Sequence, residues 1–147
     1  VVPVSTLAAV ALDAFDKAAA AEGDCVAVAF DARMDEVYWG CYRLEGGFPV
    51  ALAPERVCAP EQVDLPPDQQ PSPQTWLAAG GGWRYADRMP ASVCDRVTPV
   101  ADTDVPDARC VARLAQQIYQ SQGGVAAAEA QPVYLRDEVT WQKLPGR

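Results

Sequence analysis

Six consecutive apolar residues, CVAVAF at 25–30, require a fold in which other parts of the chain pack on both of their sides. The run is short for a helix and is typical of a strand buried on both faces. Residues 37–44 are rich in aromatic and branched side chains and predict a second strand. Gly46 and Gly47 predict a turn, after which residues 48–52 return as a third strand. Residues 25–52 therefore predict a β-meander.

A helix is expected before this meander. Apolar residues recur at helical spacing between residues 7 and 18. Ser5 or Thr6 is the expected N-cap, and Gly23 suits a left-handed stop after the helix. Residues 1–4, VVPV, are expected to end a strand that leads into this helix.

A second strand and helix region follows a polar loop. Residues 64–75 hold four prolines and predict an exposed loop. WLAAGGGWRYADRM, residues 76–89, predicts a strand, a glycine turn and a helix, and residues 97–107 form another polar loop. Asp104 or Asp107 then opens a helix. Its apolar stripe contains Val111, Leu114, Ala115, Ile118 and Tyr119. We therefore predict one α/β domain over all 147 residues, with three layers and a mixed sheet with flanking helices.

The charge and residue content exclude several classes of function. The chain carries 20 Asp and Glu against 12 Lys and Arg, a net charge of −8, and it contains no histidine. An acidic chain repels phosphate backbones, so it is a poor candidate for an independent nucleic-acid binder. Histidine is the commonest general base and metal ligand in proteins, so its absence argues against the usual forms of both kinds of site. No apolar run approaches the roughly 18 residues of a membrane span, so we expect no membrane attachment.

The five cysteines lie at positions 25, 41, 58, 94 and 110. Their number is odd, and they include no CxxC pair of the kind that binds zinc or exchanges disulfides. Reduced, mostly buried thiols in a cytoplasmic protein are the expected state.

Two short motifs admit a chemical interpretation beside a structural one. The glycines of AAGGGW, residues 78–83, could approach a phosphate, but turns from strand to helix use glycine for geometry alone, and Trp83 could crowd the space. Asp31 follows the buried strand, where a catalytic carboxylate would fit and where a turn-initiating Asp fits equally. We favour the structural interpretation of both motifs. The sequence predicts no catalytic residue, no cofactor and no metal site.

Two stretches, DARMDEVYWGCY at 31–42 and PVYLRDEVTWQKLPGR at 132–147, resemble the best-marked segments in the C-terminal half of the TsaB (YeaZ) family. The opening VPVSTLAA, residues 2–9, is similar to the family's entry into its second lobe. The resemblance runs in order over most of the chain and is weakest between residues 53 and 130.

This resemblance implies a fold and partners that composition cannot give. It implies a ribonuclease-H-like, actin-like (ASKHA) lobe, the second of two, and the abrupt start without Met is expected for a piece of a longer protein. It further implies a non-catalytic subunit that works with a TsaD-like catalytic subunit and a TsaE-like ATPase. That complex puts a threonylcarbamoyl group on the tRNA adenosine next to the anticodon. A homodimer is possible, and tRNA is expected to bind only through the complex.

The family motifs fall on residues that we expect to form a partner or interlobe surface rather than a catalytic centre. The candidate surface residues are Arg33, Glu36, Tyr38, Tyr134, Arg136, Trp141 and Lys143. The same motifs also include Asp31, Ala32, Pro132, Leu135, Leu144 and Pro145. If residues 132–135 run extended, Tyr134 and Leu135 face opposite ways, and one of them is expected to reach the core.

Two other classes of function remain open. One is half of a two-lobed actin-like-fold enzyme, an ATPase, a kinase or an M22-type peptidase, whose active site needs the missing lobe. The other is a self-sufficient ligand-binding module. An upstream phosphate-binding glycine loop with a metal-binding acid would favour the first.

Overall fold

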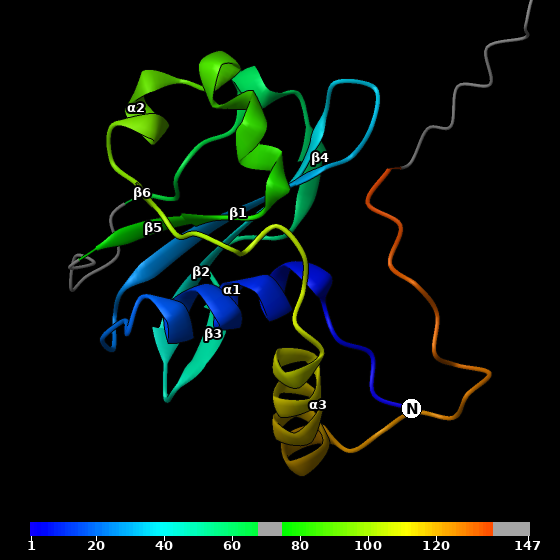
Figure 1. The fold of residues 1–147 in the computed structure, drawn as a ribbon. Helices are drawn as coiled ribbons and strands as arrows, with labels where there is room; N and C mark the ends of the chain where they lie inside the picture. Colours follow the sequence, from blue (N-terminus) through cyan, green and yellow to red (C-terminus); the bar gives the residue numbers. More distant parts are fainter. Residues whose placement is uncertain (68–74, 137–147) are drawn as a thin grey trace, which may run out of the picture.

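The computed structural model describes residues 1–67 and 75–136, and a six-stranded mixed sheet lies at its centre (Figure 1). The strand order is β3-β2-β1-β5-β6, with β4 beside β2. The strands are β1 (Cys25–Asp31), β2 (Val37–Glu45), β3 (Phe48–Ala51), β4 (Arg56–Cys58), β5 (Trp76–Ala79) and β6 (Thr98–Pro99). The helices are α1 (Thr6–Lys17), α2 (Ala91–Cys94) and α3 (Ala108–Gln122), with 3₁₀ helices η1 (Pro60–Gln62) and η2 (Gly81–Arg88).

The apolar run 25–30 forms β1, the middle strand, as its composition predicts. It pairs antiparallel with β2, from Cys25 opposite Arg43 to Asp31 opposite Val37, and parallel with β5. The glycine turn between β2 and β3 is confirmed, and its two residues have φ of 57° and 79°, which is the hairpin conformation that favours glycine. The predicted α/β class with a mixed sheet is therefore confirmed.

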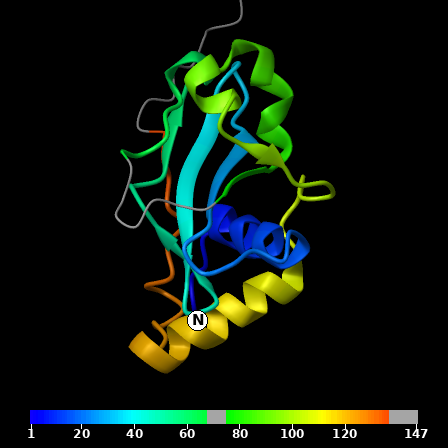
Figure 2. The same cartoon turned by 90° about the vertical axis from the view of Figure 1, so that its left-hand side faces the viewer.

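Each face of the sheet has its own hydrophobic core. On one face, α1 packs Val10, Ala14 and Phe15 against Val26 and Val28 of β1. On the other face, Trp39, Cys41 and Ala27 lie under Met89 and Val93, from the region that contains η2 and α2. Figures 1 and 2 show the resulting layers, with the sheet between α1 and the η2–α2 region.

A third core joins α3 to the outer side of α1. Cys110 and Leu114 of α3 contact Ala9 and Leu12 of α1. The predicted apolar stripe of α3 is only partly correct, because Val111 is 36% exposed and Tyr119 is 63% exposed. The sequence periodicity is genuine, but α3 covers α1 along a narrow line and leaves the rest of that stripe outside.

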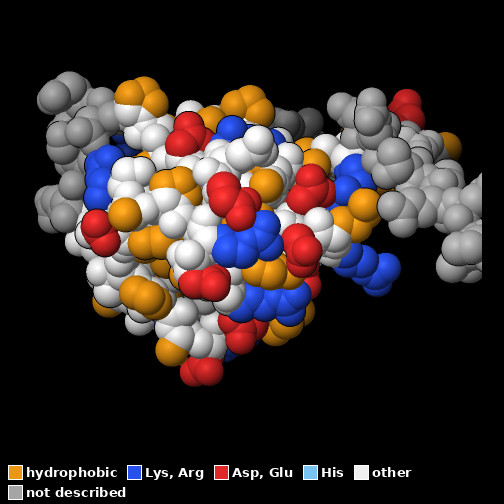
Figure 3. All heavy atoms as spheres, turned by 90° about the horizontal axis from the view of Figure 1, so that it is seen from above, with side chains coloured by type: hydrophobic (Ala, Val, Ile, Leu, Met, Phe, Trp, Pro, Cys, Tyr) orange, Lys and Arg blue, Asp and Glu red, His pale blue; other side chains and the backbone are white. Residues whose placement is uncertain are grey.

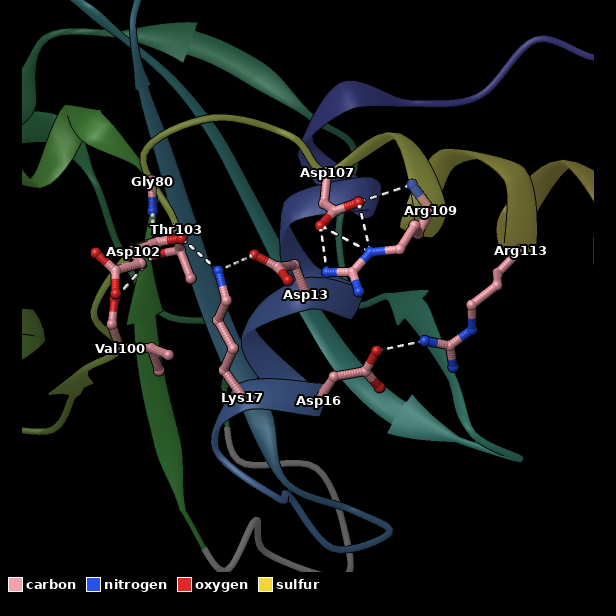
Figure 4. A network of polar contacts seen from close by, with 10 residues as sticks. All are labelled: Asp13, Asp16, Lys17, Gly80, Val100, Asp102, Thr103, Asp107, Arg109 and Arg113. Atoms are coloured by element: carbon pink, nitrogen blue, oxygen red, sulfur yellow. Dashed lines mark hydrogen bonds and ion pairs between the residues drawn. The ribbon is translucent and has the colours of Figure 1, made fainter.

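Polar contacts hold the same region together (Figure 4). Lys17 forms an ion pair of 2.7 Å with the buried Asp13 and donates to the backbone carbonyl of Asp102. Thr103, also buried, donates to the carbonyl of Val100 at 2.9 Å and accepts from the N–H of Gly80. These bonds tie α1, the loop before α3 and the glycine turn after β5 to one another.

The predicted helix starts are confirmed at both long helices. Ser5 Oγ accepts from the N–H of Ala8 at 3.2 Å, and the Asp107 carboxylate accepts from the N–H of Arg109 at 2.7 Å. The expected stop at Gly23 is wrong, because α1 ends at Lys17 and Gly23 (φ 90°) belongs to the following turn.

Three further expectations need correction. Residues 1–4 form no strand, because their one described backbone partner is Val125, whose N–H donates to the Val1 carbonyl at 2.8 Å. The helix expected after the glycine turn is a 3₁₀ helix, η2. The short strand β6 lies within the loop predicted at residues 97–107, and β4 was not predicted, since two or three residues carry no periodic pattern.

The turn between β5 and η2 needs glycine because it lies close to the backbone of β1. This agrees with the structural interpretation of AAGGGW. Gly80 has φ of 95°, and a Cβ there would lie 2.2 Å from the carbonyl oxygen of Ala29. A Cβ on Gly82 would lie 2.7 Å from the carbonyl carbon of Ala29. The Trp83 indole donates to the Ala27 carbonyl at 3.1 Å and fills the space beside β1.

The five cysteines are unpaired, and burial raises the pKa of the Cys41 thiol from 9.0 to about 12 and that of Cys25 to about 11. Above pH 9 an unfolded thiol loses its proton while the folded thiol keeps it, so stability falls as pH rises from about 9 towards 12. We expect urea midpoints to decline over this window and to decline less steeply in Cys41→Ala. Equal slopes in the two proteins would contradict this assignment.

Candidate functional site

The turn between β1 and β2 has an unusual backbone. Arg33, Met34 and Asp35 are consecutive residues with φ of 62°, 55° and 58°, a region that side-chain-bearing residues rarely adopt. Asp31 Oδ1 accepts from the Arg33 N–H at 3.0 Å, and the Ala32 N–H donates to the Glu36 carbonyl at 2.9 Å. Asp31 thus initiates the turn, which supports the structural interpretation of this residue.

Arg136 joins the C-terminal part of the chain to this turn. Its Nη2 donates to the Ala32 carbonyl at 3.1 Å and lies 2.5 Å from the Glu36 carboxylate, and its Nη1 lies 3.5 Å from the Met34 sulfur. The guanidinium therefore contacts three residues of one turn through its two terminal nitrogens. Two motifs 104 residues apart in sequence meet at this point.

Residues 126–136, which we name the strap, run along the molecule without regular structure (Figure 1). The bond between Val125 and Val1 holds one end, and Arg136 holds the other. Tyr134 is 79% exposed and Leu135 is half-buried, so the expectation that one of them reaches the core is wrong. The reason is that the strap crosses the surface beside the sheet and adds no strand to it.

Arg136→Ala is expected to free the end of the strap while leaving the domain folded. The ion pair between Arg136 and Glu36 is partly exposed to solvent, which screens it and limits its contribution to global stability. Amide exchange should therefore rise within residues 126–136, with a change in melting temperature of about 2 °C or less. Arg113→Ala, which removes the ion pair between α3 and Asp16, is the control and should leave exchange in the strap unchanged. Unchanged strap exchange in Arg136→Ala would contradict the anchoring role.

A groove with a volume of about 990 Å³ lies between the strap and the body of the domain. Its walls are the strap from residue 130, residues 3–7 before and within α1, and the loop 104–106. Phe30 and Tyr38, from the paired ends of β1 and β2, also line it. Most of these side chains are apolar, and they come from segments that only the fold brings together.

The charged groups on the groove are largely engaged by neighbours. Asp31 Oδ2 lies 2.6 Å from Arg84 Nη2. Glu55 accepts hydrogen bonds from Ser5 and from the buried Tyr42 hydroxyl. Burial, with the hydrogen bond to Glu55, raises the pKa of Tyr42, so the phenol remains protonated and continues to donate. Asp104 adds a third carboxylate at the loop.

This arrangement suits binding better than proton transfer. The Asp31 and Glu55 carboxylates are held by an arginine or by hydroxyl donors. Among residues 1–67 and 75–136, no group of three or more Cys, Asp or Glu side chains could hold a metal ion. Exposed apolar side chains gather instead, with Val105, Val133 and Tyr134 between 71% and 82% exposed. Such patches mark interaction surfaces.

The structure brings together five of the seven predicted surface residues. Glu36 and Arg136 bind each other, Arg33 lies in the turn they share, and Tyr38 and Tyr134 line the groove. The other two, Trp141 and Lys143, lie outside the described residues. Trp39, the neighbour of Tyr38 on β2, is only 3% exposed and belongs to the core.

Sequence reasoning missed the groove residues Phe30, Glu55, Asp104 and Val105. Nothing local distinguishes them, because their shared position depends on how β1, the loop before α3 and the strap pack. The position of Phe30 next to Asp31, at the end of an apolar run, was the nearest available signal.

The face of the molecule over η2 and α2 carries no large patch of basic side chains among the described residues. Acidic and basic side chains alternate there (Figure 3), and Arg88 pairs with Glu61 at 2.7 Å. Within the described part of the chain, none of the helices has the length and apolar character needed to span a bilayer.

Comparison with known proteins places this chain beside one group. No family model matches it. Two proteins named tRNA threonylcarbamoyladenosine biosynthesis protein TsaB, from Haemophilus influenzae and Escherichia coli, are 34% and 35% identical to it over 100% and 98% of its length. The chain spans about 60% of the length of these relatives.

Solved structures give the same result for the fold. YeaZ from Pseudomonas aeruginosa matches with a TM-score of 0.76 and 39% identity, over 90% of this chain and 57% of that one. A protein described as uncharacterized, with similarity to peptidase YEAZ from Pseudomonas aeruginosa, matches with a TM-score of 0.77 and 40% identity over the same shares.

Proposed function

This chain is a relative of the TsaB (YeaZ) family, and we propose from that kinship that it takes part in forming threonylcarbamoyladenosine on tRNA. The observation that carries the proposal is 34% identity along the whole chain to a protein named for that pathway. Because the chain spans about 60% of these relatives, we further propose that it is one lobe, the second, of a two-lobed protein.

Within the pathway, we propose a non-catalytic role as partner of a TsaD-like catalytic subunit and a TsaE-like ATPase. The net charge of −8 and the missing histidine support this role, as does the engagement of the Asp31 and Glu55 carboxylates in the groove. The exposed apolar groove supports action through contact with other proteins. tRNA then binds through the complex, in the cytoplasm.

A peptidase-like or actin-like enzyme that needs a further lobe is the second candidate. The description of one structural neighbour as similar to a peptidase favours it. Asp31, at the end of β1, would then be the carboxylate nearest to the chemistry.

The test is reconstitution with the full-length protein. Purified TsaD-like and TsaE-like proteins from the same organism, with tRNA, ATP, threonine and bicarbonate plus the enzyme that makes the threonylcarbamoyl donor, should form threonylcarbamoyladenosine only when this protein is added. Mass spectrometry of the digested tRNA measures the product. Asp31→Asn should leave the yield within about twofold, since a non-catalytic subunit loses no chemical step. Product formation without this protein would contradict the proposal, and loss of product in Asp31→Asn would favour the enzyme.

A further inference from the structure

We propose that the groove binds a segment of a partner protein that carries large apolar side chains together with at least one lysine or arginine. This inference rests on the proposed function, because a subunit without chemistry of its own acts through the proteins it contacts. It adds the place of contact and the chemistry of the segment that fits there.

The shape and apolar surface of the groove favour a protein segment. A volume of about 990 Å³ is enough for several side chains at once. Val105 stands on one wall and Val133 and Tyr134 on the other, and these three are the most exposed large apolar side chains of the described chain. An inserted segment would bury all three, and apolar anchors in such a site supply most of the binding energy.

The negative charge of the groove favours apolar segments that also carry a lysine or an arginine. Asp31, Glu55 and Asp104 line it, and Arg136, whose charge Glu36 balances at 2.5 Å, is the one cationic side chain among the described lining residues. Arg84 balances Asp31 from outside the groove, which leaves Glu55 and Asp104 without a cationic partner among the lining residues. Apolar walls lower the local dielectric and strengthen the attraction between these carboxylates and an incoming ammonium or guanidinium.

The same charges argue against two other occupants. A nucleic acid would bring phosphates against carboxylates, which is repulsive. A second copy of the chain brings a surface of its own with 20 acidic and 12 basic residues, so two copies repel each other on average. A partner of opposite local charge fits better than either.

Site-specific crosslinking identifies the occupant. p-Benzoylphenylalanine replaces Val105 or, separately, Tyr134 in the full-length protein, which is irradiated with purified TsaD-like and TsaE-like proteins and tRNA. We expect one crosslinked segment from a partner protein, with at least two large apolar residues and a lysine or arginine. The same substitution at Val50, 42% exposed on β3 and outside the groove, should give no such product. Crosslinks only to tRNA, to a second copy or to the protein's own chain would overturn the proposal.

Affinity measurements test the chemistry. Val105→Asp and Asp104→Arg should each weaken binding of the crosslinked partner about tenfold. Asp104→Arg should also reduce the salt dependence of binding, because it removes an attraction that salt screens. Val50→Asp and Asp95→Arg, matched changes on exposed residues elsewhere, should bind as the unmodified protein does.

The two proposals fail in different ways. If the unmodified protein supports threonylcarbamoyladenosine formation but both groove variants bind their partners normally, only the groove inference is wrong. If the unmodified protein supports no product, the proposed function itself is wrong. Circular dichroism of each variant confirms that a loss of binding does not come from unfolding.

Discussion

Gly80→Ala is expected to lower the free energy of unfolding by about 3 kcal/mol or more. The new Cβ would lie 2.2 Å from the carbonyl oxygen of Ala29, which belongs to the backbone of the central strand and cannot turn aside. The residue also has φ of 95°, which strains any side chain with a Cβ. A loss of this size corresponds to a fall of roughly 10 °C in melting temperature, measurable by calorimetry.

Gly81→Ala provides the matched control for this substitution. It lies in the same turn, its φ is ordinary, and the nearest atom to its new Cβ is 3.7 Å away. Its melting temperature should stay within about 3 °C of the unmodified protein. If the two variants lose similar amounts of stability, contact between the new Cβ and β1 is not the cause of the loss.

Trp39→Ala is expected to cost about 3–5 kcal/mol, the usual range for removing a buried tryptophan. The side chain is 3% exposed, and its ring centroid lies 5.7 Å from that of Trp83. Its Nε1 donates to the Asp64 carbonyl at 3.1 Å, so truncation also removes that hydrogen bond. The variant would lose packing between β2 and the segments that cover this face of the sheet.

Trp39→Phe separates these contributions. It retains an aromatic ring beside Trp83 and loses the indole N–H, so we expect about half the destabilisation of Trp39→Ala. Urea unfolding followed by far-ultraviolet circular dichroism measures both variants. If Trp39→Ala lowers the free energy of unfolding by less than about 1 kcal/mol, the core on this face of the sheet can repack around the missing side chain.

The sequence predicted the elements that have a long, clear pattern. The apolar run of β1, the aromatic β2 and the capped helices α1 and α3 all formed as expected. The predictions failed where neighbours decide the outcome. β6 exists because Thr98 and Pro99 lie beside β5. The start of the 3₁₀ helix η2 is set by the close approach of Gly80 and Gly82 to β1.

The candidate site divides in the same way. The motif at 31–42 and the described part of the motif at 132–147 meet in the structure, and Arg136 links them. The groove itself could not be predicted, since it depends on residues 3–7 and 104–106 reaching the strap. Sequence patterns report one element at a time, whereas a groove belongs to the packing of several.

Each margin of the sheet carries a short strand that contains proline, and the other strand beside β2, β4, is only three residues long. Pro49 lies in the four-residue β3 and Pro99 in the two-residue β6, and neither has a backbone N–H to offer to an incoming strand. Short edges interrupted in this way resist aggregation through strand addition between molecules. Such edges therefore disfavour sheet extension between molecules, and they leave side-chain surfaces such as the groove as the available places for contact.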